Sequence, residues 1–150
     1  MLDKEFEQLL FDPSKEIQGD IQWIEDQDHS PSLEFRIEVI SIAEYPLFIH
    51  GSFNALANTL TYALIHKRYG RIYALDIGKD HHNPTCNHVG ELHKHRWSEQ
   101  YRDKQAYVPT DITAPVTQTV EVWKQFCSEA FITHHGIMKD PPPLQMDLII

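Results

Sequence analysis

The sequence predicts an α+β protein with a mainly antiparallel sheet, two principal amphipathic helices and a short N-terminal helix. Two kinds of periodicity lead to this fold class: a period of two marks strands, and a period near 3.6 marks helices. Along the chain the elements run strands, helix, strands, helix, an order typical of an α+β domain. The 150 residues, 41% hydrophobic and 23% charged, are enough to bury a core and predict one domain spanning residues 1–150.

Three segments carry apolar residues at helical spacing. Six apolar side chains between Phe53 and Leu64 form the clearest stripe, and Ser52 or Asn54 is a suitable N-cap. For the last helix the candidate N-caps are Thr113 and Thr117. The predicted helices are Leu2–Leu10, Phe53–Leu64 and Val120–Phe131.

Strands are predicted where apolar and polar residues alternate or where β-branched and aromatic residues gather. The clearest case is Glu34–Ile42, in which Phe35, Ile37 and Val39 alternate with charged residues. In the first strand Ile21, Trp23 and Ile24 are the candidate buried residues. The predicted strands are Asp20–Asp26, Glu34–Ile42, Leu47–His50, Arg71–Ile77, Glu91–Trp97 and Ala106–Pro109.

The composition restricts the classes of function. A net charge of −9 argues against a general nucleic-acid coat protein, since neutralising phosphates requires a surplus of Lys and Arg. No segment has the roughly 20 consecutive apolar residues that cross a bilayer, and the acidic N-terminus is no targeting signal. Two cysteines are too few for a disulfide framework. We therefore expect a cytoplasmic protein without a membrane partner.

The stretch from His81 to His95 holds five of the ten histidines. It lies in the only cationic part of the chain: His66–Lys104 has eight basic and five acidic residues, whereas the rest has five basic and seventeen acidic. Imidazole can donate a proton, accept one or bind a metal near neutral pH. The stretch therefore predicts a functional site for an anionic ligand, such as a nucleotide or RNA.

Within the predicted strand Glu91–Trp97, His93 and His95 project from the same face. Their Cα atoms would lie about 6.6 Å apart, so the two imidazoles can meet on one metal ion or one phosphate. The simpler alternative is two surface histidines on an edge strand.

A metal-binding interpretation uses Asp76, His81, His93 and His95, with Glu99 as an alternative acid. His93-x-His95 followed by Glu99 resembles the first half of the cupin metal motif, although no second half follows. This predicts a hydrolase or cupin-like enzyme that uses a divalent metal such as Zn, Fe or Mn. The cofactor stays open at this point.

A metal-free interpretation assigns acid and base roles to His93 and His95, with His81 or His82 assisting. Tyr107 would orient the substrate, and the candidate phosphate-binding residues are Arg96, Arg102 and Lys104. The expected activity is cleavage of a phosphodiester in RNA or a nucleotide, as in bacterial toxin or defence enzymes.

Three strings tie the stretch into one unit: LDIGxxHxNP from Leu75, GxxHxHRW from Gly90 and AYVP from Ala106. With these motifs the chain resembles a small uncharacterised bacterial protein family, which implies no particular activity. A non-enzymatic alternative is an acidic interaction module. In that case the apolar tail Leu144–Ile150 would dock on a protein partner or in a homodimer.

Overall fold

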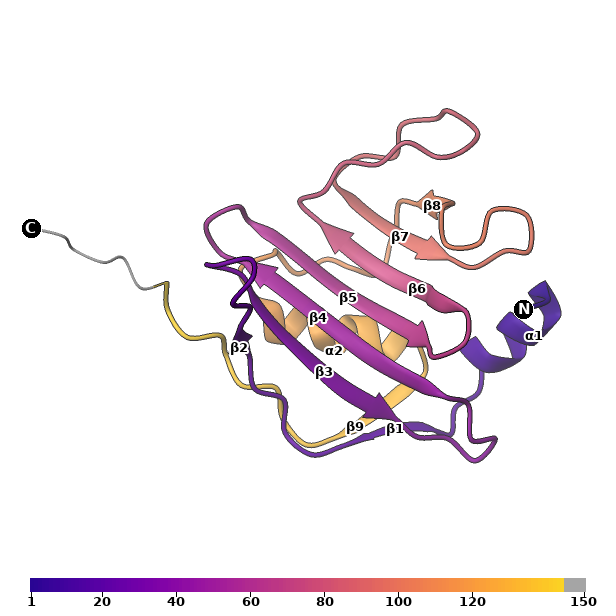
Figure 1. Cartoon of the computed structure of the whole chain (residues 1–150), viewed down its shortest axis with the longest axis horizontal. Helices are drawn as coiled ribbons and strands as arrows, with labels where there is room; N and C mark the ends of the chain where they lie inside the picture. Colours follow the sequence, from indigo (N-terminus) through magenta and orange to yellow (C-terminus); the bar gives the residue numbers. More distant parts are fainter. Residues whose placement is uncertain (145–150) are drawn as a thin grey trace, which may run out of the picture.

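The protein has an α+β fold with a mainly antiparallel sheet and two helices, as the computed structural model of residues 1–144 shows (Figure 1). Seven strands follow one another across the main sheet in chain order, and each neighbouring pair is antiparallel. These strands are β2 (Ile24–Glu25), β3 (Leu33–Val39), β4 (Leu47–Asn54), β5 (Thr59–His66), β6 (Gly70–Ile77), β7 (Leu92–Arg96) and β8 (Ala106–Tyr107).

The remaining elements are α1 (Asp3–Leu10), α2 (Thr119–Glu129) and a two-stranded parallel sheet of β1 (Lys15–Gln18) and β9 (Ile132–His135). Lys15 explains how α1 ends. Its buried ammonium donates hydrogen bonds of 2.7–2.8 Å to the carbonyls of Leu9, Leu10 and Asp12. These bonds satisfy carbonyls that have no partner within the helix.

The hydrophobic core lies between the main sheet and α2, which covers one face of that sheet (Figure 1). Tyr62 points inward from β5, with its ring centroid 5.1 Å from Trp123 and 5.9 Å from Phe126. Trp23 and Phe35 complete this group of packed rings. Because aromatic side chains bury large areas, this group of rings is a substantial part of the core.

The predicted helix over Phe53–Leu64 is wrong, since this segment is the hairpin of β4 and β5. Asn54 makes the turn: its side-chain oxygen accepts a hydrogen bond from the Ala57 amide at 3.0 Å. Asn58 adopts φ 54°, a conformation that asparagine tolerates. Leu56, expected on the buried stripe, is exposed at this turn. Sheet pairing therefore overrides an accidental helical period.

Other predictions differ from the structure in detail. The segment predicted as one strand, Asp20–Asp26, forms only the short β2, and its Ile24 is exposed while Ile21 and Trp23 are buried. Gln118, and not Thr113 or Thr117, occupies the N-cap of α2. Of the tail predicted to dock on a partner, Leu144 is described, and residues 145–150 lie outside the described residues.

Neither helix among residues 1–144 has the length and hydrophobicity needed to cross a membrane.

Candidate metal centre

Asp76 stands near the end of β6 on the sheet face that points away from α2. The register places Thr61 of β5 on one side of it and His93 of β7 on the other. The carboxyl group is buried, with 5% of the residue exposed. Such a carboxyl group needs partners, because an isolated buried charge is costly.

Strand β7 supplies two of these partners through its alternation. His93 and His95 face Asp76, whereas the intervening Lys94 points to the other side and contacts Asp111 and Glu129. Both histidines are almost fully buried, at 1% and 3% exposed. The prediction that they share one face is confirmed.

Backbone carbonyls fix the orientation of both rings. Nδ1 of His93 donates to the Gly90 carbonyl at 2.9 Å, and Nδ1 of His95 donates to the Asp103 carbonyl at 2.7 Å. A carbonyl can only accept, so each Nδ1 carries a proton. Each Nε2 is thereby directed at Asp76, and both histidines have the orientation found for metal ligands.

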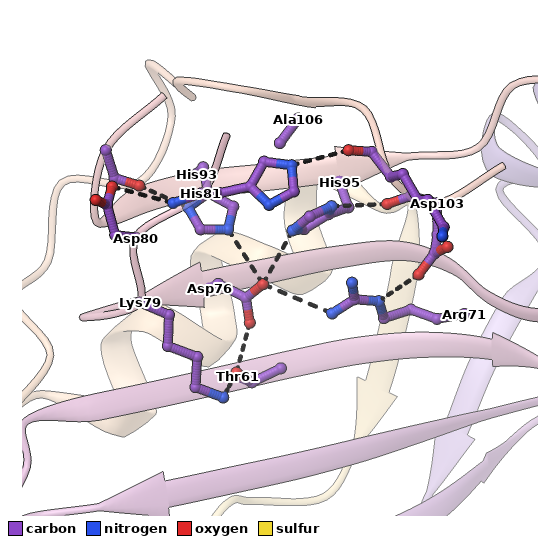
Figure 2. A network of polar contacts seen from close by, with 12 residues as sticks. Thr61, Arg71, Asp76, Lys79, Asp80, His81, His93, His95, Asp103 and Ala106 are labelled. Atoms are coloured by element: carbon purple, nitrogen blue, oxygen red, sulfur yellow. Dashed lines mark hydrogen bonds and ion pairs between the residues drawn. The ribbon is translucent and has the colours of Figure 1, made fainter. Parts of the chain in front are cut away.

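His81 joins these residues from the loop after β6 (Figure 2). Its Nε2 lies 2.8 Å from the Lys104 carbonyl, and its ring centroid is 5.3 Å from His93 and 4.6 Å from His95. Gly78 starts the loop with φ +85°, where a Cβ would lie 2.2 Å from the Asn58 carbonyl oxygen. Only glycine fits that turn, so the direction of the loop is built into the backbone.

Asn83 anchors the same loop to β8. Its side-chain amide donates to the Ala106 carbonyl and accepts from the Ala106 amide, both at 2.8 Å. The loop backbone is closed by the Val89 amide, which donates to the His81 carbonyl at 2.9 Å. These bonds hold His81 over the sheet face although it is half-buried and not packed in the core.

We call Asp76, His81, His93 and His95 the inner cluster. Oδ2 of Asp76 lies 3.3 Å from Nε2 of His93 and 3.2 Å from Nε2 of His95. One ring nitrogen from each of the three histidines lies within 4.8 Å of the others. His93 and His95 therefore converge with Asp76 on one side and with His81 on the other.

The charge of Asp76 is maintained by its surroundings. Burial alone would raise the pKa of its carboxyl group, but hydrogen bonds from His93, His95 and Thr61 and the nearby Arg71 guanidinium outweigh burial. The net effect holds the pKa of Asp76 well below its ordinary range. The carboxylate is thus ionised and available as a ligand at neutral pH.

Cationic side chains border the inner cluster on two sides (Figure 2). Nη1 of Arg71 lies 3.6 Å from Oδ2 of Asp76, and its Nε donates to Asp103 at 3.0 Å. Nζ of Lys79 donates to the Thr61 hydroxyl at 2.8 Å, and that hydroxyl donates to Oδ1 of Asp76 at 2.6 Å. An anion approaching the cluster would meet both cations.

Sequence reasoning missed Arg71 as a site residue because of a β-bulge. Arg71 and Asp76 are five residues apart, so a regular strand would place them on opposite faces. Between β5 and β6, however, the register skips Ile72, which turns into the core. The bulge brings Arg71 to the Asp76 face. The predicted cationic character of the segment was the only signal for it.

His82, predicted as an alternative to His81, points away from the inner cluster. It packs against His88, with ring centroids 4.7 Å apart. Cys86 is exposed on the same loop and Glu99 bonds the start of α1, so neither reaches the inner cluster. The structure thus distinguishes the two neighbouring histidines, which the sequence could not.

Four other predicted site residues lie elsewhere. Arg96 and Tyr107 line a cavity of about 500 Å³ beside α1, with the Arg96 guanidinium 5.5 Å from the Phe6 ring. Arg102 lies over Trp97 at 5.5 Å. Lys104 contributes only its carbonyl, to His81. The structure does not bring these four side chains to the histidines, and their phosphate-binding or substrate-orienting roles stay predictions.

The fold and the site together define a small α+β protein with a mainly antiparallel sheet. On the sheet face away from α2 it carries a cluster of buried Asp76, His93 and His95 with half-buried His81. The chain belongs to a family of unknown function (DUF6978), whose profile matches residues 1–132. The predicted resemblance to an uncharacterised family is therefore confirmed. No curated protein and no solved structure matches the chain.

Proposed function

We propose that this protein binds one divalent transition-metal ion at the inner cluster. The observation that carries the proposal is the pair of contacts from Asp76 Oδ2 to the Nε2 atoms of His93 and His95, at 3.3 and 3.2 Å. Ligands about 2.0–2.1 Å from a tetrahedral ion lie about 3.3–3.4 Å from one another. Charge-assisted hydrogen bonds are shorter, at about 2.7–2.9 Å.

The proton count supports the same proposal. Each Nδ1 already holds the proton that it donates to a carbonyl, so without a metal each Nε2 would need a second ring proton to donate to Oδ2 of Asp76. Two imidazolium rings would then meet at one carboxylate oxygen, with the Arg71 guanidinium 3.6 Å from it. With a metal the two Nε2 atoms are lone-pair donors, and the crowding at Oδ2 is relieved.

The ligand types favour particular ions. Imidazole and carboxylate together suit Zn²⁺, Fe²⁺ and Ni²⁺, while hard ions such as Mg²⁺ prefer oxygen ligands. Four protein ligands would complete a tetrahedral zinc site, whereas a six-coordinate ion would retain open positions. His81 is the half-buried member, so any open position would face the solvent beside it.

The chemistry that such an ion supplies is polarisation of a substrate oxygen and activation of water. Arg71 and Lys79 border the inner cluster and would attract the negative charge of a phosphate group. These two cations are the observation that favours hydrolysis of a phosphodiester, in RNA or a nucleotide, as the reaction. They replace Arg96 and Arg102, which lie away from the histidines.

Metal content tests the binding proposal. We expect about one equivalent of transition metal in the purified protein after dialysis, and loss of that equivalent in a His93→Ala/His95→Ala variant. The matched control is His134→Ala/His135→Ala, which removes two histidines from β9, away from the inner cluster. Equal metal in both double variants would refute the assignment.

A separate assay tests the reaction. Metal-loaded protein should cleave labelled RNA or a chromogenic phosphodiester. Lys79→Met, which removes a cation that bonds Thr61 and not Asp76, should raise KM with the metal content unchanged. Loaded protein that binds its metal but is inactive on a broad panel of phosphodiesters would refute the hydrolase and leave metal binding standing.

A further inference from the structure

The loop that carries His81 holds a second group of metal-binding side chains. We call Asp80, His82 and His88 the outer cluster. One ligand atom from each of them lies within 4.8 Å of the others, and all three residues are exposed. None of them belongs to the inner cluster, so the outer cluster is a separate site.

The backbone of this loop places the three side chains on the same side of the loop. His82 and His88 form an antiparallel bridge, and residues directly opposite in such a pair project from the same side. Their rings are 4.7 Å apart, and Nε2 of His88 lies 2.5 Å from Oδ1 of Asp80. The geometry brings three donors from separate positions of the loop to one point.

The loop is also rigid enough to hold a site. Its backbone is closed on both sides of the bridge, because Asn83 bonds the Asn87 carbonyl and Val89 bonds the His81 carbonyl. The buried Asn83 side chain ties the loop to Ala106 through two hydrogen bonds. Ligands fixed before binding lose less entropy when the ion arrives, which raises the affinity of an exposed site.

Alternation along the chain separates the two clusters. Asp80, His81 and His82 are consecutive, and in this segment His81 faces the sheet while its two neighbours face the solvent. One short segment can therefore supply ligands to two ions without sharing any side chain between them.

We propose that the outer cluster is a second divalent-metal site, selective for imidazole-binding ions such as Zn²⁺ and Ni²⁺. It has three protein ligands, so water completes the coordination. No backbone carbonyl orients the described rings of His82 and His88, in contrast to His93 and His95. Because such orienting partners are worth about 10- to 100-fold, we expect the outer site to be weaker by at least that factor.

The test is a Zn²⁺ titration followed by NMR of the histidine rings and by equilibrium dialysis. Wild-type protein should bind two equivalents, and the rings of His82 and His88 should shift together during the second. The His82→Ala/His88→Ala variant should lose only the weaker equivalent. The His93→Ala/His95→Ala variant should lose only the tighter one, so the two sites fail independently.

His29→Ala is the matched control, since His29 is an exposed histidine paired with Asp26 at 3.2 Å. This variant should retain both equivalents. A single equivalent in wild-type protein at millimolar Zn²⁺ would overturn the proposal. So would a second equivalent that persists in His82→Ala/His88→Ala, which would mark an adventitious ion only.

Discussion

The inner and outer clusters use the same residue types in opposite environments. Both combine histidines with one aspartate, and both draw on the loop after β6. In the inner cluster the side chains of Asp76, His93 and His95 are 2–7% exposed, whereas the paired side chains of Asp80 and His88 are 54–56% exposed.

The difference between the clusters lies in what surrounds the ligands. Each inner histidine has one ring nitrogen held by a backbone carbonyl, and Asp76 is held by Thr61 and Arg71. In the outer cluster the contact is between two of the ligands themselves, Asp80 and His88. The types of the ligand residues therefore do not determine metal affinity by themselves. The groups that hydrogen-bond to the ligands and orient them also determine it.

The largest expected effect is on metal affinity in His93→Ala/His95→Ala. Structural zinc sites gain about 10–16 kcal/mol from four ligands, so two ligands account for about 6 kcal/mol, or about 10⁴-fold. A competition assay with a chromogenic chelator measures the loss. A decrease below tenfold would mean that the inner cluster is not the tight site.

Metal removal should lower the stability of the wild-type protein by about 4 kcal/mol when the free ion is at 1,000 times its Kd. Denaturant unfolding with and without a strong chelator measures this difference. The His88→Ala variant should show the same difference, because its inner cluster is intact. A chelator effect that disappears in His88→Ala would reverse the ranking of the two clusters.

His81→Ala should have an intermediate effect. His81 comes from a loop and is half-buried, while the other three inner ligands come from strands. We expect affinity to fall by about 10- to 100-fold, with the metal-free protein as stable as wild type to within about 0.5 kcal/mol. The His82→Ala variant is the neighbouring control and should keep wild-type affinity at the inner cluster.

The smallest effect is expected for His88→Ala at the inner cluster. Asn83 and Val89 hold the loop without help from His88, so His81 should stay in place. The metal affinity of the inner cluster should change by less than about threefold, because substitutions at sites that share no partners act independently. A larger change, measured by the same chelator competition, would show that the outer cluster positions His81.

Much of the inner cluster could be predicted from local pattern. The alternation of β7 put His93 and His95 on one face, and the strand before Gly78 put Asp76 at the same end of the sheet. Strand periodicity could not tell which of His81 and His82 faces the inner cluster. That choice depends on the turn at Gly78 and on the hydrogen bonds of Asn83 to Ala106.

The missed residue Arg71 and the wrong helix have tertiary causes. Arg71 reaches the inner cluster because the bulge at Ile72 reverses its face. Of the helical stripe in Phe53–Leu64, Phe53, Leu60 and Leu64 occupy buried positions of the hairpin, whereas Leu56 is exposed at its turn. Pairing between strands, and not local propensity, determined each of these outcomes.

The proposed function depends on an ion held between Asp76, His93 and His95. Anomalous diffraction from crystals grown with Zn²⁺, recorded at the zinc edge, locates such an ion directly. We expect a peak about 2.0–2.2 Å from Nε2 of His93, Nε2 of His95 and Oδ2 of Asp76. A structure in which the two Nε2 atoms still contact Asp76 directly, with no peak between them, would contradict the proposal.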